Sequence, residues 1–328
     1  MEVPAVGRIA PPLSPQTKAL CQFSRYPFCS RVGSVHFRDT GFIMPHAFLP
    51  GRAFVDIGGA DAESFLQNLI TTDLPGLQPG ETAPGALLTP QGKIMFFFLV
   101  GRTETGFRLE TDSTARDNLL KRLMMYRLRA AVELAPLGEN GVTVSWGEPA
   151  DGLVDRRFAK AGVPLTRQPG DGTGETGSDA EAYTALRIAH GIAEDPIDYA
   201  EGDAFPHDVL LDRSGGLSFR KGCYVGQEVV SRMQHRGTAR RRLVQVTAED
   251  ALPASGTALT AGGKSIGTLA TVQGTAGLAL VRIDRAGEAI AAGLPILTGD
   301  MPVTLALPDW SELSFPLDTP PEAAGDGA

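Results

Sequence analysis

The chain has 328 residues, of which 42% are hydrophobic and 21% charged, and its formal net charge is −8. This composition is ordinary for a globular protein, and the length allows one large domain or two to three smaller ones. The longest uninterrupted apolar run, Ile94–Val100, has the length of a strand and falls far short of the ~20 residues that a membrane span needs. We therefore expect no contact with a membrane.

Cysteine and histidine are too sparse to predict disulfides or a metal site. The three cysteines, Cys21, Cys29 and Cys223, are unevenly spaced and form no CxxC pair, which favours a reducing compartment. No two of the five histidines stand at the spacing of metal ligands. We expect no zinc site and no other resident metal.

Residues 1–43 differ from the rest of the chain. They hold five basic residues and two acids, with scattered Pro and Ser and no sustained periodicity. One interpretation is a targeting leader, which would direct the protein to the mitochondrial matrix. The other is sequence upstream of the true start at Met44, in a cytoplasmic bacterial protein. Under either interpretation this segment lies outside the fold.

The predicted elements begin after residue 50. Arg52–Ile57 reads as a strand, and Asp61 is placed to cap a helix whose apolar face holds Phe65, Leu66, Leu69 and Ile70. Three runs then predict strands, with turn residues between the first two: 85–89, 94–100 and 107–111. This order indicates an α+β unit rather than a parallel doubly wound sheet.

A second helix is predicted over 114–131, with one apolar stripe formed by Leu119, Leu120, Leu123, Met124 and Leu128. Strands are expected at 132–134 and 142–146, and a surface loop at 167–178, which is rich in Gly, Pro and Asp. Asp179 should then cap a helix that ends at Gly191.

After Arg242 the pattern changes to short strands separated by turns, which is typical of a small β-barrel or sandwich. The expected strands are 243–247, 258–260, 265–272, 277–283 and 303–307. The residues from about Phe315 onward have the composition of a disordered tail.

Residues 213–242 are basic within an acidic protein. They hold eight basic residues and one acid, Glu228. A solvated face is one interpretation, and a surface that binds an anion is the other. The run overlaps the most distinctive motif of the chain, which favours the anion.

That motif is Lys-Gly-Cys-Tyr-Val-Gly-Gln-Glu at residues 221–228. Its glycines, Gly222 and Gly226, permit close backbone approach, and the residues after Gly226 can form a helix. Cys223 would then lie just before a helix N-terminus and beside Lys221, which favours the thiolate over the thiol. The competing interpretation of Cys223 is a small buried hydrophobe.

The octapeptide resembles the signature of the YgfZ-type folate-binding proteins and their mitochondrial iron–sulfur assembly relatives. Residues 65–73, Gln91-Gly92-Lys93 and 215–219 are also similar to that family, and the likeness covers roughly residues 50–310. The resemblance implies a three-part fold like that of the glycine-cleavage T-protein, with two interleaved ferredoxin-like α+β units and a C-terminal β-barrel. The expected divisions are a leader at 1–43, a folate-binding core at 44–238, the barrel at 239–313 and a tail at 314–328.

The resemblance also implies a bound tetrahydrofolate or derivative and a role in assembly or repair of iron–sulfur clusters, including those of enzymes that modify tRNA. It implies that Cys223 is a functional thiol, that Asp208 contacts the pterin and that Lys221 or Arg232 lies nearer the glutamate tail. The remaining implied folate contacts are Gln67, Tyr224, Gln227 and Glu228.

A single cysteine is a poor permanent site for a cluster, because clusters need several thiolates. We therefore expect any cluster to be transient and shared with a partner of the A-type carrier class. Two positions depart from the family: Phe97 replaces an Asp or Asn, and Leu210 replaces an Asn.

Two other functions remain open at this point. One is a tetrahydrofolate-dependent aminomethyl- or methyltransferase, which the apolar Phe97 argues against. The other is an RNA-binding protein that uses the basic run. Base stacking needs exposed aromatic side chains, and only Phe219 and Tyr224 lie in that run, so direct nucleic-acid binding is not expected.

Overall fold

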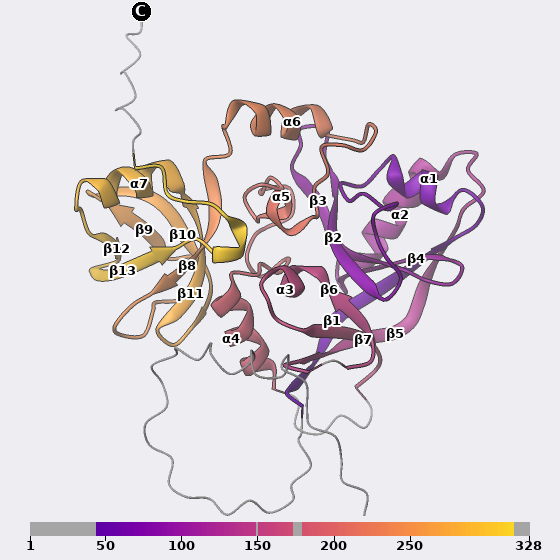
Figure 1. Ribbon diagram of the computed structural model, residues 1–328, viewed down its shortest axis with the longest axis horizontal. Coiled ribbons are helices and arrows are strands. Elements are labelled where there is room, and N and C mark those ends of the chain that lie inside the picture. The colour runs from indigo at the N-terminus through magenta and orange to yellow at the C-terminus, as the bar shows by residue number, and fades with distance from the viewer. Residues whose placement is uncertain (1–43, 149, 173–178, 318–328) are drawn as a thin grey trace, which may run out of the picture. The chain divides into compact units, whose positions relative to one another are not determined.

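The computed structural model describes residues 44–148, 150–172 and 179–317 (Figure 1). Residues 1–43, 173–178 and 318–328 lie outside this range, so the predictions for the leader, for most of the Gly-rich loop and for most of the tail are not addressed by it. None of the helices in the described part is long and apolar enough to cross a membrane.

Seven strands of the N-terminal part form one closed sheet in the order β1-β4-β3-β2-β6-β7-β5. Their bounds are β1 His46–Gly58, β2 Glu81–Leu88, β3 Ile94–Arg102, β4 Gly106–Asp112, β5 Glu133–Trp146, β6 Leu153–Asp155 and β7 Leu165–Pro169. The predicted runs at 85–89, 94–100 and 107–111 fall in β2, β3 and β4 and are confirmed. The α+β class is confirmed as well.

The long strand β1 joins the two α+β units of this part. Its second half pairs with β4, while β5 pairs along almost its whole length, with a shift of register between Leu49 and Val55. The segments 132–134 and 142–146, predicted as separate strands, fall in the single strand β5 except for residue 132. The strands of the two units are therefore continuous rather than two independent sheets.

The first helix is α1, Ala62–Gln67, and its buried residues include Phe65 and Leu66 as predicted. Asp61 stands at the N-cap position, but its side chain makes no cap hydrogen bond. Its Oδ2 instead accepts a hydrogen bond from the backbone N–H of Ala131 at 2.8 Å. The predicted cap is therefore wrong, because a distant chain segment competes for the carboxylate.

The second helix, α2, runs from Arg116 to Arg127 and is shorter than predicted. Leu119 and Leu123 are buried, but Met124 and Leu128 of the expected apolar stripe are exposed. Leu128 ends the helix with a φ of 43°, so it cannot continue the helical face. The stripe is narrower than the sequence pattern indicated.

The helix α4, Ala180–His190, confirms its prediction at both ends. The Asp179 carboxylate accepts a hydrogen bond from the N–H of Ala182 at 2.7 Å, and Gly191 ends the helix with a φ of 62°. Arg167, expected at the start of a surface loop, instead lies in β7, buried and paired with Glu110. That part of the loop prediction is wrong, because a buried partner outweighs the local turn composition.

The C-terminal strands form a second closed barrel in the order β10-β11-β8-β13-β12-β9. They are β8 Arg241–Thr247, β9 Ala258–Ala261, β10 Lys264–Gln273, β11 Ala276–Arg282, β12 Ile296–Thr298 and β13 Met301–Ala306. The predicted barrel is confirmed, although β12 and the helix α7, Ile283–Ala291, were not anticipated. Phe315, expected in the tail, packs against the core of this barrel.

A buried network of charged groups joins the two barrels. Asp198 accepts hydrogen bonds from Arg187 of α4 at 2.9 Å and from the backbone N–H of Thr271 in β10 at 3.0 Å. Within the first barrel, burial raises the pKa of Glu110, but Arg167 and Arg52 outweigh this effect and hold the value at about 2. The segments between the barrels are thereby held in place by ionic contacts as well as by packing.

Four short elements complete the structure and lie around the junction of the two barrels (Figure 1). They are α3 Arg156–Lys160, α5 Leu211–Ser214, α6 Gln227–Arg236 and the 3-10 helix Asp309–Ser311. The helix α6 follows the signature motif directly. Asp208 of the predicted site lies at this junction.

Candidate functional site

Residues 215–226, here called the signature loop, form hydrogen bonds with the turn that follows α1. The backbone N–H of Ser218 donates to the Thr71 carbonyl at 2.9 Å, and the Thr71 hydroxyl donates to the Gly216 carbonyl at 2.6 Å. The Nζ of Lys221 donates to the carbonyls of Ile70 and Thr72 at 2.7 and 2.8 Å. Two segments about 150 residues apart, both similar to the YgfZ family, therefore meet here.

The ammonium group of Lys221 is oriented into the protein rather than toward an external anion. Burial lowers its pKa to about 8, and the nearby Asp73 carboxylate opposes this effect only in part. Asp73 in turn accepts a hydrogen bond from the Gln67 side chain at 2.8 Å, and Gln67 also accepts one from the N–H of Leu74. The side chains of Lys221 and Gln67 thus form hydrogen bonds that stabilise this turn.

Tyr224 fixes the other end of the signature loop. Its ring is buried beneath the Lys221 ammonium, which lies 5.3 Å from the ring centroid, and its hydroxyl donates to the Ser218 carbonyl at 3.2 Å. Burial raises the pKa of this hydroxyl, so the tyrosine stays neutral. The contacts of Lys221 and Tyr224 therefore hold the signature loop in place on both sides of Gly222 and Cys223.

Cys223 lies exposed on this braced loop. The interpretation of Cys223 as a buried hydrophobe is therefore wrong. The helix α6 begins at Gln227, so the cysteine precedes it by four residues and does not occupy its first turn. The structure thus presents a thiol to solvent on a segment that its neighbours hold in place.

Close approach of backbone occurs at Gly226 rather than at Gly222. Gly226 has a φ of 79°, and an added Cβ would lie 2.6 Å from the Thr89 carbonyl oxygen, whereas at Gly222 it would meet nothing within 4 Å. The hairpin at Gly92 packs against Val229 in the same place. Gly226 therefore allows the β2–β3 hairpin to touch the start of α6.

Three of the predicted folate contacts, Gln227, Glu228 and Arg232, lie on α6. Glu228 and Arg232 pair with each other one turn apart, and both side chains are more than half exposed. No hydrogen bond of the Gln227 side chain occurs among the described residues. These side chains remain candidates for an external ligand, and their role stays a prediction.

Asp208 lies in a different place, at the edge of a groove between α6 and the C-terminal barrel. Lys93, Asp203, Phe205, Asp208, Met233, Thr238, Arg240, Arg241 and Arg282 line a hollow of about 300 Å³, here called the cationic groove. A second hollow of about 410 Å³ shares Asp203, Arg241 and Arg282 with it. The two hollows together follow the junction of the barrels.

The contacts of Asp208 leave one of its oxygens available. Its Oδ2 accepts hydrogen bonds from the Phe205 N–H and from Arg241, both at 2.9 Å, whereas its Oδ1 has no partner in the described part of the chain. Burial raises the pKa of Asp208, while Arg241 and the Phe205 N–H oppose the rise. Asp208 therefore keeps one carboxylate oxygen that no described residue engages.

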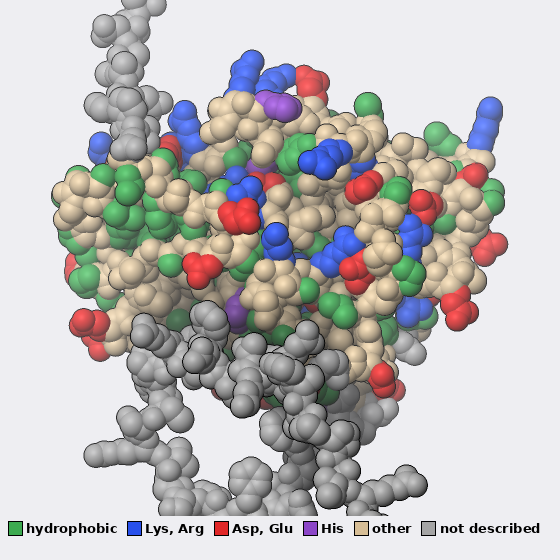
Figure 2. Space-filling view, in the orientation of Figure 1, with side chains coloured by type: hydrophobic (Ala, Val, Ile, Leu, Met, Phe, Trp, Pro, Cys, Tyr) green, Lys and Arg blue, Asp and Glu red, His purple; other side chains and the backbone are tan. Residues whose placement is uncertain are grey.

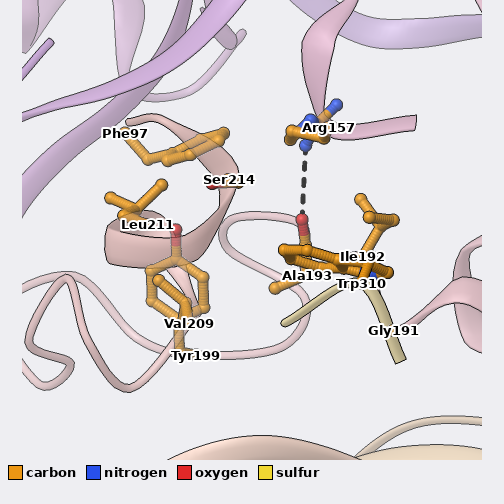
Figure 3. A pocket seen from close by; sticks show the side chains of 10 residues that line it. All are labelled: Phe97, Arg157, Gly191, Ile192, Ala193, Tyr199, Val209, Leu211, Ser214 and Trp310. Carbon is orange, nitrogen blue, oxygen red and sulfur yellow. Dashed lines mark hydrogen bonds between the residues drawn. The ribbon is translucent and has the colours of Figure 1, made fainter. Parts of the chain in front are cut away.

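Phe97 lies at a third place, a small pocket at the centre of the junction (Figure 3). The pocket holds only about 20 Å³, room for about one water molecule, and its lining includes Tyr199 and Arg157 but no carboxylate. The Arg157 guanidinium donates to the Ala193 carbonyl at 3.3 Å. The polar side chains that this small pocket offers are therefore those of Arg157, Tyr199 and Ser214, with the Trp310 indole.

Most of the basic run at 213–242 is engaged within the protein. Arg213 donates to the Ser311 carbonyl, Arg241 pairs with Asp203 and Asp208, and Arg242 pairs with Asp212. Figure 2 shows one face of the molecule, and over its middle Lys and Arg side chains lie next to Asp and Glu side chains. The run is therefore not a continuous free cationic surface, which argues against RNA binding.

The sequence did not single out Lys93 and Arg241 as site residues. Lys93 was noted only as part of a hairpin and Arg241 only as part of the segment after the motif. Both become groove residues because β3 and β8 come together at Asp208. The weak signal that existed was the run of three arginines at 240–242.

Comparisons with known proteins concern the family and the fold of the chain. The family described as "CAF17, C-terminal beta-barrel domain" matches residues 240–313. The chain is 35% identical over 306 residues to "Iron-sulfur cluster assembly factor IBA57, mitochondrial" of Mus musculus, with 80% of this chain and 84% of the relative covered. It is 32% identical over 304 residues to the protein of the same name from Homo sapiens, with the same two shares.

Among solved structures, the aminomethyltransferase T of the glycine cleavage system from Bartonella henselae superposes with a TM-score of 0.60. The match covers 81% of this chain and 86% of that one, at 14% identity, and so shows the fold alone. The three-part architecture expected from the resemblance is therefore confirmed. With the fold, the signature and these identities in agreement, the chain belongs to the family of iron–sulfur cluster assembly factors that comprises the IBA57 and YgfZ-type proteins.

Proposed function

We propose that this protein is a folate-binding accessory factor for the assembly or repair of iron–sulfur clusters, including those of enzymes that modify tRNA. The observation that carries the proposal is the exposed thiol of Cys223 on the braced signature loop. A cysteine that serves only packing would be buried, whereas this one is available to another molecule. Lys221 and Tyr224 hold the loop, and Cys223 makes the contact.

The cluster is cargo that passes through the complex, and Cys223 is the cysteine ligand that the described part of this chain offers. No group of three or more His, Cys, Asp or Glu side chains in the described ranges could hold a metal ion. Because a cluster needs several thiolates, a partner must supply the others. We infer that this partner is an iron–sulfur carrier of the A-type class, which approaches the face that presents Cys223.

A reduced folate suits the cationic groove on chemical grounds. The free Oδ1 of Asp208 can accept a hydrogen bond from a pterin N–H group, and Lys93 is placed to attract the carboxylates of the glutamate tail. The pocket at Phe97 is too small for a pterin ring. When bound, the folate would supply a carrier for one-carbon units, while Asp208 and Arg241 would hold and orient it.

The compartment of the protein depends on the role of residues 1–43. We propose the cytoplasm of a bacterial cell, or the mitochondrial matrix if residues 1–43 act as a transit peptide. The relatives named above are mitochondrial proteins. Expression of the full chain and of a form that starts at Met44, each followed by cell fractionation, distinguishes the two.

The decisive experiment is genetic complementation with Cys223→Ser, in a strain that lacks its own protein of this family. We expect the variant to melt at the wild-type temperature, because the thiol is exposed, and yet to leave iron–sulfur enzyme activity unrestored. Gly222→Cys combined with Cys223→Ser is a matched control, since position 222 has room for a side chain and the pair only shifts the thiol. Full rescue by Cys223→Ser would contradict the proposed role of the thiol.

A further inference from the structure

The end of α2 exposes large apolar side chains. Met124, Met125 and Leu128 have relative exposures of 48%, 66% and 89%. The buried face of the same helix is formed by Leu119 and Leu123, so these three side chains are not part of the core. Methionine is enriched at protein–protein interfaces, where its flexible thioether adapts to a partner.

Leu128 is exposed at a backbone geometry that disfavours any residue other than glycine. Its φ and ψ are 43° and −101°, and it lies in a turn that the hydrogen bond from the Ala130 N–H to the Arg127 carbonyl closes at 2.8 Å. A leucine here carries backbone strain and an exposed apolar surface at once. Strain of this kind concentrates at functional sites, where another interaction compensates for it.

The same segment is strongly basic. Residues 116–129 hold five basic residues and one acid, a formal charge of +4, in a chain whose net charge is −8. Arg116 pairs with Asp117, but Lys121, Arg122, Arg127 and Arg129 make no ion pair within the described part of the chain. The apolar side chains therefore lie among cations that no acidic side chain of the described residues pairs with.

We propose that the α2 patch, defined as Met124, Met125 and Leu128 with Lys121, Arg122, Arg127 and Arg129, is a docking surface for an acidic protein. The apolar side chains would fill a socket on the partner, and the four cations would meet carboxylates around it. The inference goes beyond the proposed function, because it requires neither folate nor Cys223. The patch lies across the described region from the C-terminal barrel (Figure 1).

A discrete acidic protein fits the patch better than RNA or a membrane does. RNA would use the cations but gains nothing from two methionines and a leucine, since bases stack on aromatic side chains. An anionic membrane attracts cations but would also approach the acidic remainder of the chain. A protein partner can touch the patch alone and use both of its features.

The test places a photoreactive amino acid at Met125 of the full-length chain in living cells. The same probe at Leu294 of the C-terminal barrel, whose side chain is as exposed as that of Met124, is the matched control position. We expect an adduct with an acidic protein at Met125 only. The charge reversal Arg127→Glu with Arg129→Glu should lower the affinity of that purified protein about tenfold or more at low salt.

Lys264→Glu with Arg285→Glu, a charge reversal on the C-terminal barrel, should leave that affinity unchanged. Met125→Ser with Leu128→Ser should weaken it at high salt as well, because the apolar contacts are not screened. An adduct with lipid or RNA, an adduct that the charge reversal does not affect, or no adduct beyond that at Leu294 would each overturn the proposal. Tetrahydrofolate titration of the charge-reversed protein reports separately on the proposed function.

Discussion

Lys221 has a structural role within the signature motif, whereas Cys223 is exposed to solvent. A lysine beside an exposed cysteine could be read as an anion ligand, yet its Nζ caps two backbone carbonyls of the turn after α1. Leu210 makes a related point, because it holds a φ of 61° at the position where the resemblance to the YgfZ family led us to expect Asn. Asparagine tolerates this left-handed geometry better than leucine does.

The titration of Lys221 predicts a specific dependence of stability on pH. Its pKa is about 8 in the folded protein, against about 10.4 for a free lysine, so the unfolded chain binds the proton more tightly between these values. The unfolding free energy of the wild type should therefore rise, relative to that of Lys221→Met, as the pH increases from 7.5 to 10. Urea unfolding of both proteins at several pH values measures this difference, and parallel curves would contradict it.

The cationic groove predicts how folate affinity depends on single side chains. Tetrahydrofolate should bind, and its triglutamate form should bind more tightly, with a gain that shrinks as salt rises. Asp208→Ala should weaken both forms about equally, by about 1–3 kcal/mol, because it removes the acceptor for the pterin. Lys93→Gln should weaken the triglutamate form more, since Lys93 attracts the tail.

Calorimetry with both ligands measures these changes. Arg232→Ala is the informative comparison, because the resemblance placed Arg232 near the tail while the structure pairs it with Glu228 on α6. A larger loss of triglutamate affinity from Arg232→Ala than from Lys93→Gln would move the tail from the groove to α6. Binding that needs millimolar folate would remove the folate from the proposed function.

At the scale of elements, α2 is short, weakly buried and ended by a strained residue. Its buried side consists of Leu119 and Leu123, while the residues near its C-terminal end are exposed. A helix with so small a buried face gains little stability from packing. The backbone geometry at its end should therefore contribute measurably to the unfolding free energy. This geometry is independent of any partner and can be tested in the isolated protein.

Leu128→Gly should raise the unfolding free energy by about 1 kcal/mol, because glycine adopts the φ of 43° without strain. Met125→Gly, three residues earlier in the helix, should lower it by about 1 kcal/mol. Chemical denaturation of the two variants measures both values. The same sign for the two changes would show that Leu128 is not strained in solution.

At the scale of the whole molecule, buried ionic contacts hold the junction of the two barrels. Asp198 is central, because it accepts hydrogen bonds from Arg187, from the Glu194 N–H at 2.7 Å and from Thr271 of the C-terminal barrel. Such a group contributes to the geometry of the cationic groove, whose lining comes from both sides of the junction. Loss of Asp198 should therefore affect stability and the groove together.

Asp198→Ala should cost about 3–5 kcal/mol, because it leaves the Arg187 charge short of a partner and the Thr271 N–H without an acceptor. Asp198→Asn should cost less, since the amide oxygen can still accept from Thr271. Hydrogen exchange of β10 should accelerate in the alanine variant more than exchange of β3. Equal stability of the alanine and asparagine variants would argue against a role for the hydrogen bonds to the barrel.

The sequence by itself determined the class of the fold and the identity of the motif. Alternating and helical periodicities are local, so β2, β3, β4, α4 and the C-terminal barrel could be predicted from neighbouring residues. The signature at 221–228 is also local, and it identified the family and the thiol. The domain boundaries and the roles of the individual site residues remain predictions.

The tertiary structure alone decided which charged groups face inward. Lys221, Arg167 and Asp208 look alike in the sequence as solvent-facing polar residues, but each meets a partner from a distant segment. Their contacts depend on how the turn after α1 meets the signature loop, how β4 meets β7 and how β8 meets Asp208, which no local pattern encodes. Local periodicity thus determines where helices and strands form. The direction of a long charged side chain depends instead on its desolvation and on its ionic partners, which only the folded protein provides.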